Sequence, residues 1–275
     1  KNGRHDLADD VLSNTNNINV SMALSEVLQK YPDGDKKREH IADLIKTHAL
    51  AHEDCAVIEK YLTSPSDSID TKATVINAAV ANGMDVSLEF VVRNILPVAG
   101  NENTLSILDA YCSKKLVDDD VFRILNFACT CKDSKTAVGA LDCLKRGNQY
   151  VLVPSKTVIA MLSERDLTAS DKISILDKLF EFKVEVKSVE AVMTNYLCFN
   201  QDPVATRKEV ILYLLDKSPQ LPTSTVQNYV LKCAVDGNEK PAIVKAIFDK
   251  GLNTSFFNEL LSKYMNSSTD SNEVK

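Results

Sequence analysis

The amino-acid sequence predicts an all-α solenoid built from about seven and a half antiparallel helix pairs. Three observations predict it: an apolar motif, a Leu-Asp pair and a helix-capping serine each return along the 275 residues. The apolar motif returns about every 33 residues, a period that is typical of two-helix repeats. A single pair cannot bury its own apolar face, whereas stacked pairs share one continuous core.

The apolar motif has the form h-x-x-h-h, where h is an apolar residue. Only Lys60, in the second unit of the series, departs from it at an h position. The first residues of the successive motifs are Leu24, Val57, Leu88, Val121, Val158, Val189, Val226 and Phe257.

The other two markers recur independently of the first. An apolar residue is followed by aspartate in the other helix of each later pair, at Asp109, Asp142, Asp177, Asp216 and Asp249. Serine precedes the first helix of several pairs, at Ser87, Ser155, Ser188, Ser224 and Ser255. A serine there can accept a hydrogen bond from an unpaired N–H of the first turn.

The helices follow in order from these markers. The first, or A, helices are predicted at 19–30, 54–63, 87–97, 119–131, 156–164, 188–198, 224–235 and 255–265. The second, or B, helices are predicted at 36–50, 71–82, 103–115, 134–146, 169–182, 203–217 and 239–250. Residues 18–265 form the repeat domain, between a flexible segment at 1–17 and a disordered tail at 266–275.

One short stretch conflicts with this pattern. "FKVEVK" at 182–187 alternates apolar and charged residues, as a half-buried strand does. It spans only six residues and lies where the repeat requires a connection between two helices. We therefore predict a turn there and no strand.

Composition narrows the class of protein. The net charge of −6 lacks the strongly basic character of a typical nucleic-acid binder. No apolar run approaches the ~18–20 residues that span a bilayer. Seven cysteines at irregular spacing favour an intracellular, reducing compartment, mitochondrial or cytoplasmic.

Two segments carry a family resemblance. "DVFRILNFACTCKDSKTAVGALDCLKRGNQYVLVPS" and "KISILDKLFEFKVEVKS" resemble pentatricopeptide repeats, in an A helix with spaced apolar anchors and a B helix containing Leu-Asp. "CAVDGNEKPAIVKAIFDKGLNTS" resembles an ankyrin helix pair, but the T-P-L-H-x-A signature is missing, and so are the tetratricopeptide and HEAT signatures. The resemblance covers about residues 20–265 and is degenerate.

The pentatricopeptide resemblance implies organellar RNA binding through a small polar residue after the first anchor of each A helix. That position holds Ser25, Ile58, Glu89, Phe122, Ile159, Glu190, Gln227 and Asn258. Ser25 and Asn258 fit best, and they stand in the first and last units. RNA binding is therefore the alternative, and protein binding the main prediction.

Several histidines, cysteines and aspartates have spacings that could suggest metal binding or catalysis. His48, His52 and Cys55 have a spacing that could hold zinc, and His40 lies nearby, but the repeat places a turn in this segment. Cys129 and Cys131 are expected to be buried apolar residues. The aspartates one repeat apart form a ladder on the solvent side of the B helices, since they cannot converge on one substrate.

The sequence thus predicts a non-enzymatic scaffold, without cofactor or metal, whose partner is another protein. The apolar residues after the anchors, Ile58, Phe122 and Ile159, are the candidate contacts. The same residues could also belong to the core between helices.

Overall fold

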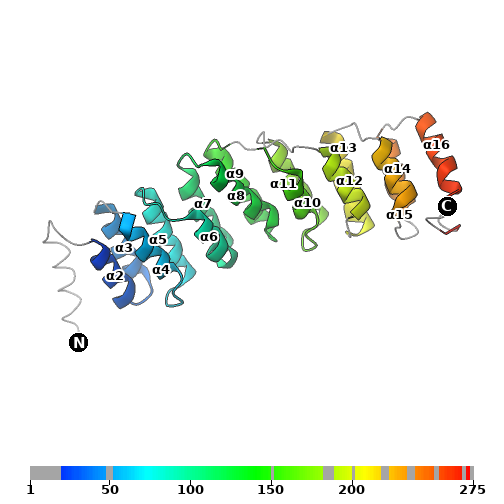
Figure 1. Ribbon diagram of the computed structural model, residues 1–275. Coiled ribbons are helices and arrows are strands. Elements are labelled where there is room, and N and C mark those ends of the chain that lie inside the picture. The colour runs from blue at the N-terminus through cyan, green and yellow to red at the C-terminus, as the bar shows by residue number, and fades with distance from the viewer. Residues whose placement is uncertain are drawn as a thin grey trace. The chain divides into compact units, whose positions relative to one another are not determined.

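A computed structural model gives the fold. It describes residues 20–47, 52–149, 152–181, 189–199, 202–217, 223–233, 239–250, 254–267 and 271–272. In these residues the regular structure is helical throughout, and α-helices alternate with short connections (Figure 1). The chain is an all-α solenoid, as predicted.

The A helices are the first members of the pairs. They are α2 (Val20–Lys30), α4 (His52–Leu62), α6 (Leu88–Asn94), α8 (Asp118–Thr130), α10 (Ser155–Leu162), α12 (Val189–Phe199), α14 (Thr223–Lys232) and α16 (Thr254–Met265).

The B helices are the second members. They are α3 (Asp35–Thr47), α5 (Ile69–Ala81), α7 (Asn101–Cys112), α9 (Ser134–Arg146), α11 (Ala169–Glu181), α13 (Val204–Lys217) and α15 (Glu239–Asp249). Every helix predicted from the sequence is present, with ends displaced by at most a few residues.

The largest difference from the prediction is in the third A helix. A continuous helix was expected over 87–97, but α6 ends at Asn94 and a single 3₁₀ turn, Leu96–Val98, follows. Pro97 stands at the start of this turn. Proline lacks a backbone N–H and disfavours the helical conformation of the residue before it, so the α-helix ends there.

The serine marker holds at one position and is wrong at three. Ser87 is the N-cap of α6, and its hydroxyl accepts a hydrogen bond from the backbone N–H of Phe90 at 3.3 Å. Ser155 is the first residue inside α10, whose N-cap is Pro154 without a side-chain bond. Ser224 lies inside α14, and Ser255 lies inside α16. The remaining serine, Ser188, lies outside the described residues.

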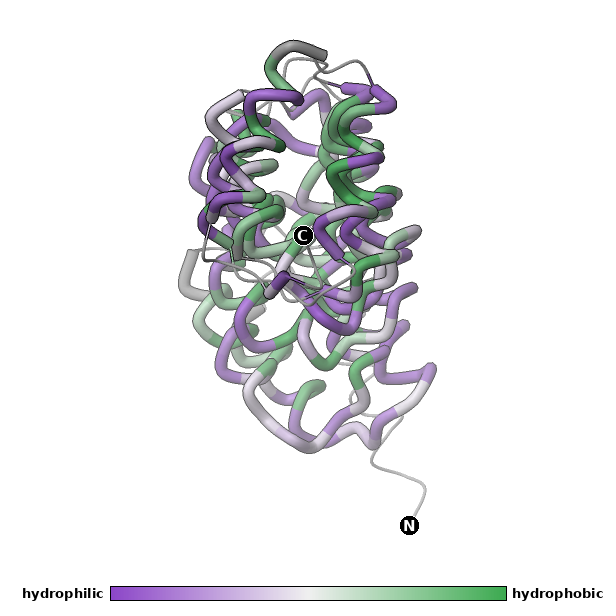
Figure 2. The backbone as a smooth tube through the Cα atoms, turned by 90° about the vertical axis from the view of Figure 1, so that its right-hand side faces the viewer, coloured by the Kyte–Doolittle hydropathy of each residue, from purple (hydrophilic) through white to green (hydrophobic). Residues whose placement is uncertain are grey.

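The described residues separate into two compact units. The first consists of 1–124 with 146–149, and the second of 125–145 with 150–275, so that α8 begins in one and ends in the other. In the first unit α5 packs between α3 and α7. In the second, α13 packs against α11 and α15, and α12 against α10 and α14. Figure 2 shows that hydrophobic and hydrophilic residues alternate along the helices.

The recurring apolar motif supplies the core of both units. Leu24, Ile124, Val158, Met193 and Val226, for example, have essentially no exposed surface. At the C-terminal end the pattern weakens, because Leu261 in α16 is 45% exposed. Among the described residues, every helix is too short or too polar to cross a lipid bilayer.

Some predictions fall outside the described residues. They are the turn at 182–187, the N-terminal segment 1–17, and positions 268–270 and 273–275 of the tail.

Candidate functional site

The recurring aspartates lie along the B helices and bind the next B helix. Asp109 of α7 accepts from Arg146 at 2.6 Å within the first unit. In the second unit Asp142 lies 3.4 Å from Lys178, and Asp177 lies 3.0 Å from Lys217. These pairs form an ion-pair ladder along the B helices; the sequence predicted the ladder of aspartates, but not their basic partners.

The ladder continues to the last B helix, α15. Asp216 of α13 pairs with Lys250 just after α15, and Asp249 lies 2.8 Å from Lys245 of its own helix. Tyr213 adds a hydrogen bond to Asp177 at 2.8 Å, and this bond is the main reason that the pKa of Asp177 is lowered. The recurring aspartates of the B helices are thus paired with basic side chains.

A second recurring position was missed by the sequence analysis. In the first turn of every B helix, one equivalent position carries a polar side chain that is almost fully buried; we call it the polar position. It is occupied by Lys37, Thr71, Thr104, Thr136, Lys172, Arg207 and Lys240. Burying an ammonium or guanidinium group is costly unless it is paired and hydrogen-bonded, so each basic member requires partners nearby.

Those partners come from the next repeat. Near the end of each following A helix is a buried residue that we call the ring position: Tyr61, Ile95, Ala128, Leu162, Tyr196, Tyr229 and Tyr264. Where the polar position is basic, the ring position is tyrosine, and where it is threonine, the ring position is aliphatic. This correlation holds in all seven repeats and could have been read from the sequence.

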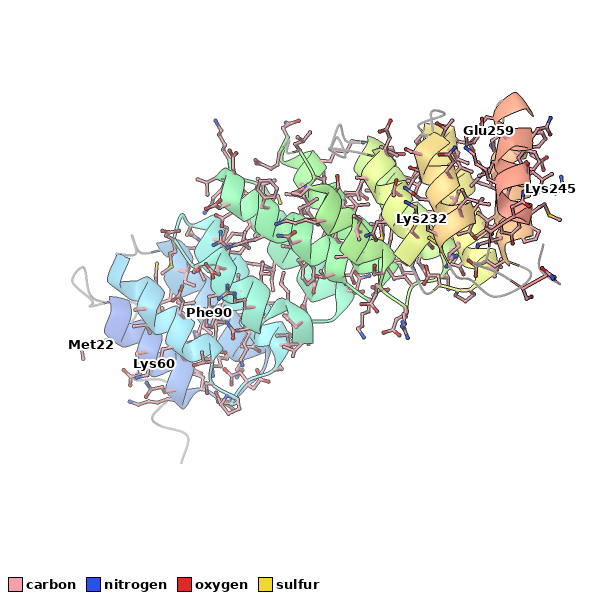
Figure 3. The ribbon with its side chains drawn as sticks, turned by 45° about the vertical axis from the view of Figure 1, so that its right-hand side comes forward. Met22, Lys60, Phe90, Lys232, Lys245 and Glu259 are labelled. Carbon is pink, nitrogen blue, oxygen red and sulfur yellow. The ribbon has the colours of Figure 1, made fainter. Side chains whose placement is uncertain are left out.

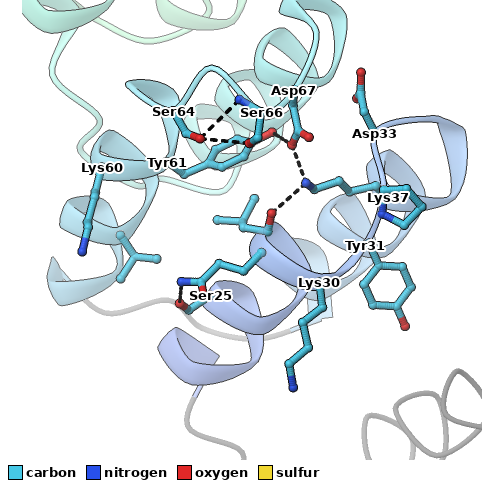
Figure 4. Close-up of a pocket in the computed structure, with 14 residues that line it drawn as sticks. Ser25, Lys30, Tyr31, Asp33, Lys37, Lys60, Tyr61, Ser64, Ser66 and Asp67 are labelled. Carbon is cyan, nitrogen blue, oxygen red and sulfur yellow. Dashed lines mark hydrogen bonds and ion pairs between the residues drawn. The ribbon is translucent and has the colours of Figure 1, made fainter.

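In the first unit the basic group is Lys37 of α3. Its Nζ donates to the carbonyl oxygen of Leu28 at 2.7 Å, pairs with Asp67, and lies 5.5 Å from the ring centroid of Tyr61. Tyr61 donates to the same carboxylate, while desolvation and this hydrogen bond raise the pKa of the phenol. Lys37, Tyr61 and Asp67 therefore form a closed buried cluster (Figure 4).

This cluster forms one wall of a hollow of about 720 Å³ between α2, α4 and their connections. Lys30, Lys60 and Ser25 also line the hollow (Figure 4). Ser25 is held by Gln29, whose Nε2 donates to its hydroxyl at 3.1 Å. The hollow therefore combines the exposed ammonium groups of Lys30 and Lys60 with a wall in which the charge of Lys37 is already neutralised by Asp67.

The second unit repeats the cluster with the same chemistry. Nζ of Lys172 donates to the carbonyl of Leu162 at 2.7 Å, pairs with Asp202, and lies 6.0 Å from the ring of Tyr196. Tyr196 donates to Asp202 at 2.6 Å. The tyrosine precedes the aspartate by six residues in both clusters, so the arrangement is the same at two distant places in the sequence.

The remaining basic positions vary this arrangement. Arg207 of α13 forms a buried ion pair with Glu239, which also accepts a 3.4 Å hydrogen bond from Tyr229. Nζ of Lys240 lies 5.4 Å from the ring of Tyr264. These clusters are enclosed in the core, so their role is to join successive repeats.

The outer face of α6 and α8 in the first unit has a different composition. We call it the Phe–Arg face; it comprises Glu89, Phe90, Arg93, Phe122 and Arg123. Glu89 lies 2.7 Å from Arg123 and 2.8 Å from Arg93. The hydrogen bond from Arg123, followed by the charges of both arginines, lowers the pKa of Glu89. Phe90, which is labelled in Figure 3, and Phe122 are both half-buried.

The three candidate contacts predicted from the sequence lie in different environments. Ile58 in α4 is fully buried, so it belongs to the core, which is the alternative that the sequence left open. Phe122 and Ile159 are half-buried, on α8 and α10, and belong to different units. Of the three, Phe122 lies on the Phe–Arg face.

Of the residues whose spacing could hold zinc, those that the structure describes do not come together in a metal site. His40 lies against Tyr31, with the ring centroids 4.9 Å apart and the rings tilted by 54°, and Cys55 is buried. His48 and the side chain of His52 lie outside the described residues. Across the described part of the chain, His, Cys, Asp and Glu do not form a group that could hold a metal ion.

The cysteines considered with them are buried to different degrees. Cys129 is fully buried, and desolvation raises the pKa of its thiol to about 12. Cys131 is only half-buried, so the expectation of a buried residue holds for the first of the two.

Comparison with known protein families, with curated proteins and with solved structures gives no match to this chain. The helical-repeat architecture therefore rests on the periodicity of the sequence and on the packing of its helices.

Proposed function

We propose that this chain is a non-enzymatic helical-repeat scaffold that binds another protein, as a subunit of a larger complex in a mitochondrial or cytoplasmic compartment. The observation that carries the proposal is the Phe–Arg face. Aromatic and arginine side chains are enriched among the residues that contribute most to protein–protein binding.

The contrast with the B helices supports the placement of the contact. Four of the recurring aspartates on the B helices are already paired with the next repeat, so a partner would have to compete with these pairs. On the Phe–Arg face, Arg93 is 74% exposed and shares Glu89 with Arg123. Arg123 also lies 3.4 Å from Asp120, so Arg93, which shares Glu89 and is the more exposed of the two, is the guanidinium that remains available to an acidic side chain of a partner.

The test is affinity purification with matched variants of the full chain. Arg93→Glu reverses a charge on the Phe–Arg face, and Lys245→Glu reverses a charge of equal side-chain exposure, 74%, on a B helix. Each residue pairs with a carboxylate four positions earlier or later in its own helix, so the effects on helix stability are comparable.

We expect co-purifying proteins to be retained by wild type and by Lys245→Glu and to be lost with Arg93→Glu. Phe122→Ala is expected to weaken binding of the purified partner at least tenfold, as truncation of a central aromatic does. If all variants bind the partner equally, the contact does not lie on the Phe–Arg face. If Lys245→Glu loses the partner as completely as Arg93→Glu does, the effect is not specific to this face, and the proposed contact is rejected.

The alternative is a pentatricopeptide-like organellar RNA-binding factor. The observation in its favour is the hollow of the first unit, where Ser25 lies beside Lys30 and Lys60. Titration with single-stranded RNA at two salt concentrations separates the two functions, since phosphate contacts make affinity fall steeply with salt. Tight binding that weakens with salt and is lost with Lys60→Glu would favour RNA over protein.

A further inference from the structure

Two cysteines of the second unit lie at the ends of neighbouring A helices. Cys198 is the last residue but one of α12, and Cys233 directly follows the last residue of α14. Both side chains are half-buried, and a side-chain hydrogen bond joins them. Neither thiol has a part in the proposed protein contact.

The surrounding helices hold the two cysteines in place. α12 and α14 pack against each other, and the hydroxyls of Thr194, one turn before Cys198, and of Thr225, two turns before Cys233, are 2.8 Å apart. The backbone N–H of Cys233 donates to the carbonyl of Tyr229 at 3.4 Å, so Cys233 continues the last turn of α14. Both thiols are therefore carried by packed helix ends.

We propose that Cys198 and Cys233 form a reversible disulfide within the chain when they are oxidised. A disulfide requires the sulfurs to approach to about 2 Å, with Cα atoms about 4.4–6.8 Å apart. The two thiols already interact across packed helix ends, and a shift of these ends would have to bring the sulfurs to that distance. The bond would link two consecutive repeats covalently.

The chemistry balances with a peroxide as oxidant. One thiolate attacks a peroxide oxygen, forms a sulfenic acid and releases water once the leaving oxygen takes up a proton. The second thiol then attacks the sulfenic sulfur, the S–S bond forms, and a second water leaves. Two thiols lose two electrons in total, and one molecule of hydrogen peroxide is reduced to two of water.

The environment makes this a slow reaction at neutral pH. Desolvation, and then the hydrogen bond with Cys233, raise the pKa of Cys198 to about 12, while the charge of Arg207 opposes the shift. Because the thiolate is the nucleophile, the rate should rise about tenfold per pH unit between about pH 7 and about pH 9. An exposed cysteine, with a pKa of about 8.5, would level off within this range.

The test is peptide mapping of the full chain after treatment with hydrogen peroxide, alkylation of the remaining thiols under denaturing conditions, and tryptic digestion without reductant. Cleavage at lysine and arginine places Cys198 in peptide 188–207 and Cys233 in peptide 233–245, because Pro241 protects the bond after Lys240. We expect these two peptides to be joined and to separate on reduction. Peptide 124–132, which holds Cys129 and Cys131, is expected to remain alkylated at both.

Two variants and one size measurement complete the test. Cys198→Ser and Cys233→Ser should each abolish the joined peptide, whereas Cys131→Ser, at another half-buried thiol, should leave it unchanged. The oxidised protein should keep the size of the untreated protein in non-reducing gels. Two results would overturn the proposal. One is that Cys198 and Cys233 are still alkylated under conditions in which Cys131 has been oxidised. The other is a cross-link between two chains. Circular dichroism shows whether each variant is folded.

Discussion

Repeats with a basic residue at the polar position and repeats with threonine there solve the same packing problem in different ways. Lys172 buries an ammonium group and depends on Asp202 and Tyr196 of the following repeat. Thr136 satisfies its hydroxyl with Asp133 in its own connection, and its ring position, Leu162, is apolar. The basic repeats are therefore mutually dependent, whereas this threonine repeat is locally self-sufficient.

The largest expected effect comes from removing the counter-charge of a basic repeat. Asp202→Asn preserves the shape of the side chain but leaves Lys172 buried without a carboxylate. We expect it to lower the free energy of unfolding of this region by about 3–5 kcal/mol. Urea denaturation followed by far-UV circular dichroism measures it, since the chain has no tryptophan. A loss below about 1 kcal/mol would show that the cluster is not closed from solvent.

A double variant sharpens the same comparison. Lys172→Met with Asp202→Asn removes both charges, while the asparagine still accepts the hydrogen bond from Tyr196. Replacing a whole buried ion pair by apolar groups is often neutral, so the double variant should regain most of the stability lost in the single one. A double variant as unstable as Asp202→Asn alone would mean that packing, and not charge, dominates the cluster.

Thr136→Val tests a threonine repeat. The variant keeps the side-chain volume and loses only the hydroxyl bond to Asp133, so we expect a cost of about 1 kcal/mol. Thr104→Val is the matched control, because its hydroxyl makes only a long bond, 3.4 Å, to the carbonyl of Ala99. The urea midpoint should fall more for Thr136→Val than for Thr104→Val, and the reverse order would contradict the comparison.

A carboxylate next to another threonine repeat predicts a pH dependence. Asp33 accepts from the hydroxyl of Thr71 at 2.5 Å and from the N–H of Ser68 at 2.9 Å, and these bonds lower its pKa from 3.8 to about 2. Since the folded pKa lies below the unfolded one, the stabilisation is present above about pH 4 and is lost as the pH falls towards 2.

Asp33→Asn should therefore be less stable than wild type at about pH 5 and lose less stability on acidification to about pH 3. Urea midpoints at both pH values measure the difference. Parallel pH profiles for the two proteins would show that the carboxylate does not contribute in this way.

The smallest effect is expected at the exposed ladder. Lys217→Ala removes a partner of Asp177, which remains bonded to Tyr213, and both charged groups are partly exposed. Such pairs contribute about 0.2–1 kcal/mol and are screened by salt. We expect a loss at the low end of this range that disappears in about 1 M salt. A loss as large as that of Asp202→Asn would remove the distinction between buried and exposed pairs.

Much of the fold follows from the sequence because one period governs every helix. The apolar motif and the Leu-Asp pair place all the described helices, and the exposed ladder was anticipated from the spacing of Asp109, Asp142 and Asp177. The capping serines were less informative, since Ser155 lies inside its helix and Pro154 precedes it. A serine near a helix start does not determine which residue leaves the helical conformation.

The polar position was missed for a different reason. A lysine in the first turn of a helix is normally exposed, and only the tyrosine one repeat later distinguishes Lys37 from its neighbour Lys36. Finding it requires comparison of residues about 24 apart in two repeats, which a search for apolar residues does not make. The sequence predicted only part of the Phe–Arg face: it gave Phe122 as a candidate contact, whereas Glu89 entered only as one of the residues that follow the first anchors of the A helices.

The dependence of each basic repeat on the next determines where such a chain can gain or lose modules in evolution. A duplication or deletion that separates Lys172 from Asp202 leaves a charge in the core and is strongly selected against. The same event beside Thr136, whose hydroxyl partner is Asp133 in its own connection, leaves no charge behind. Changes in repeat number should therefore be tolerated first beside that threonine, with lysine, tyrosine and aspartate inherited as one block.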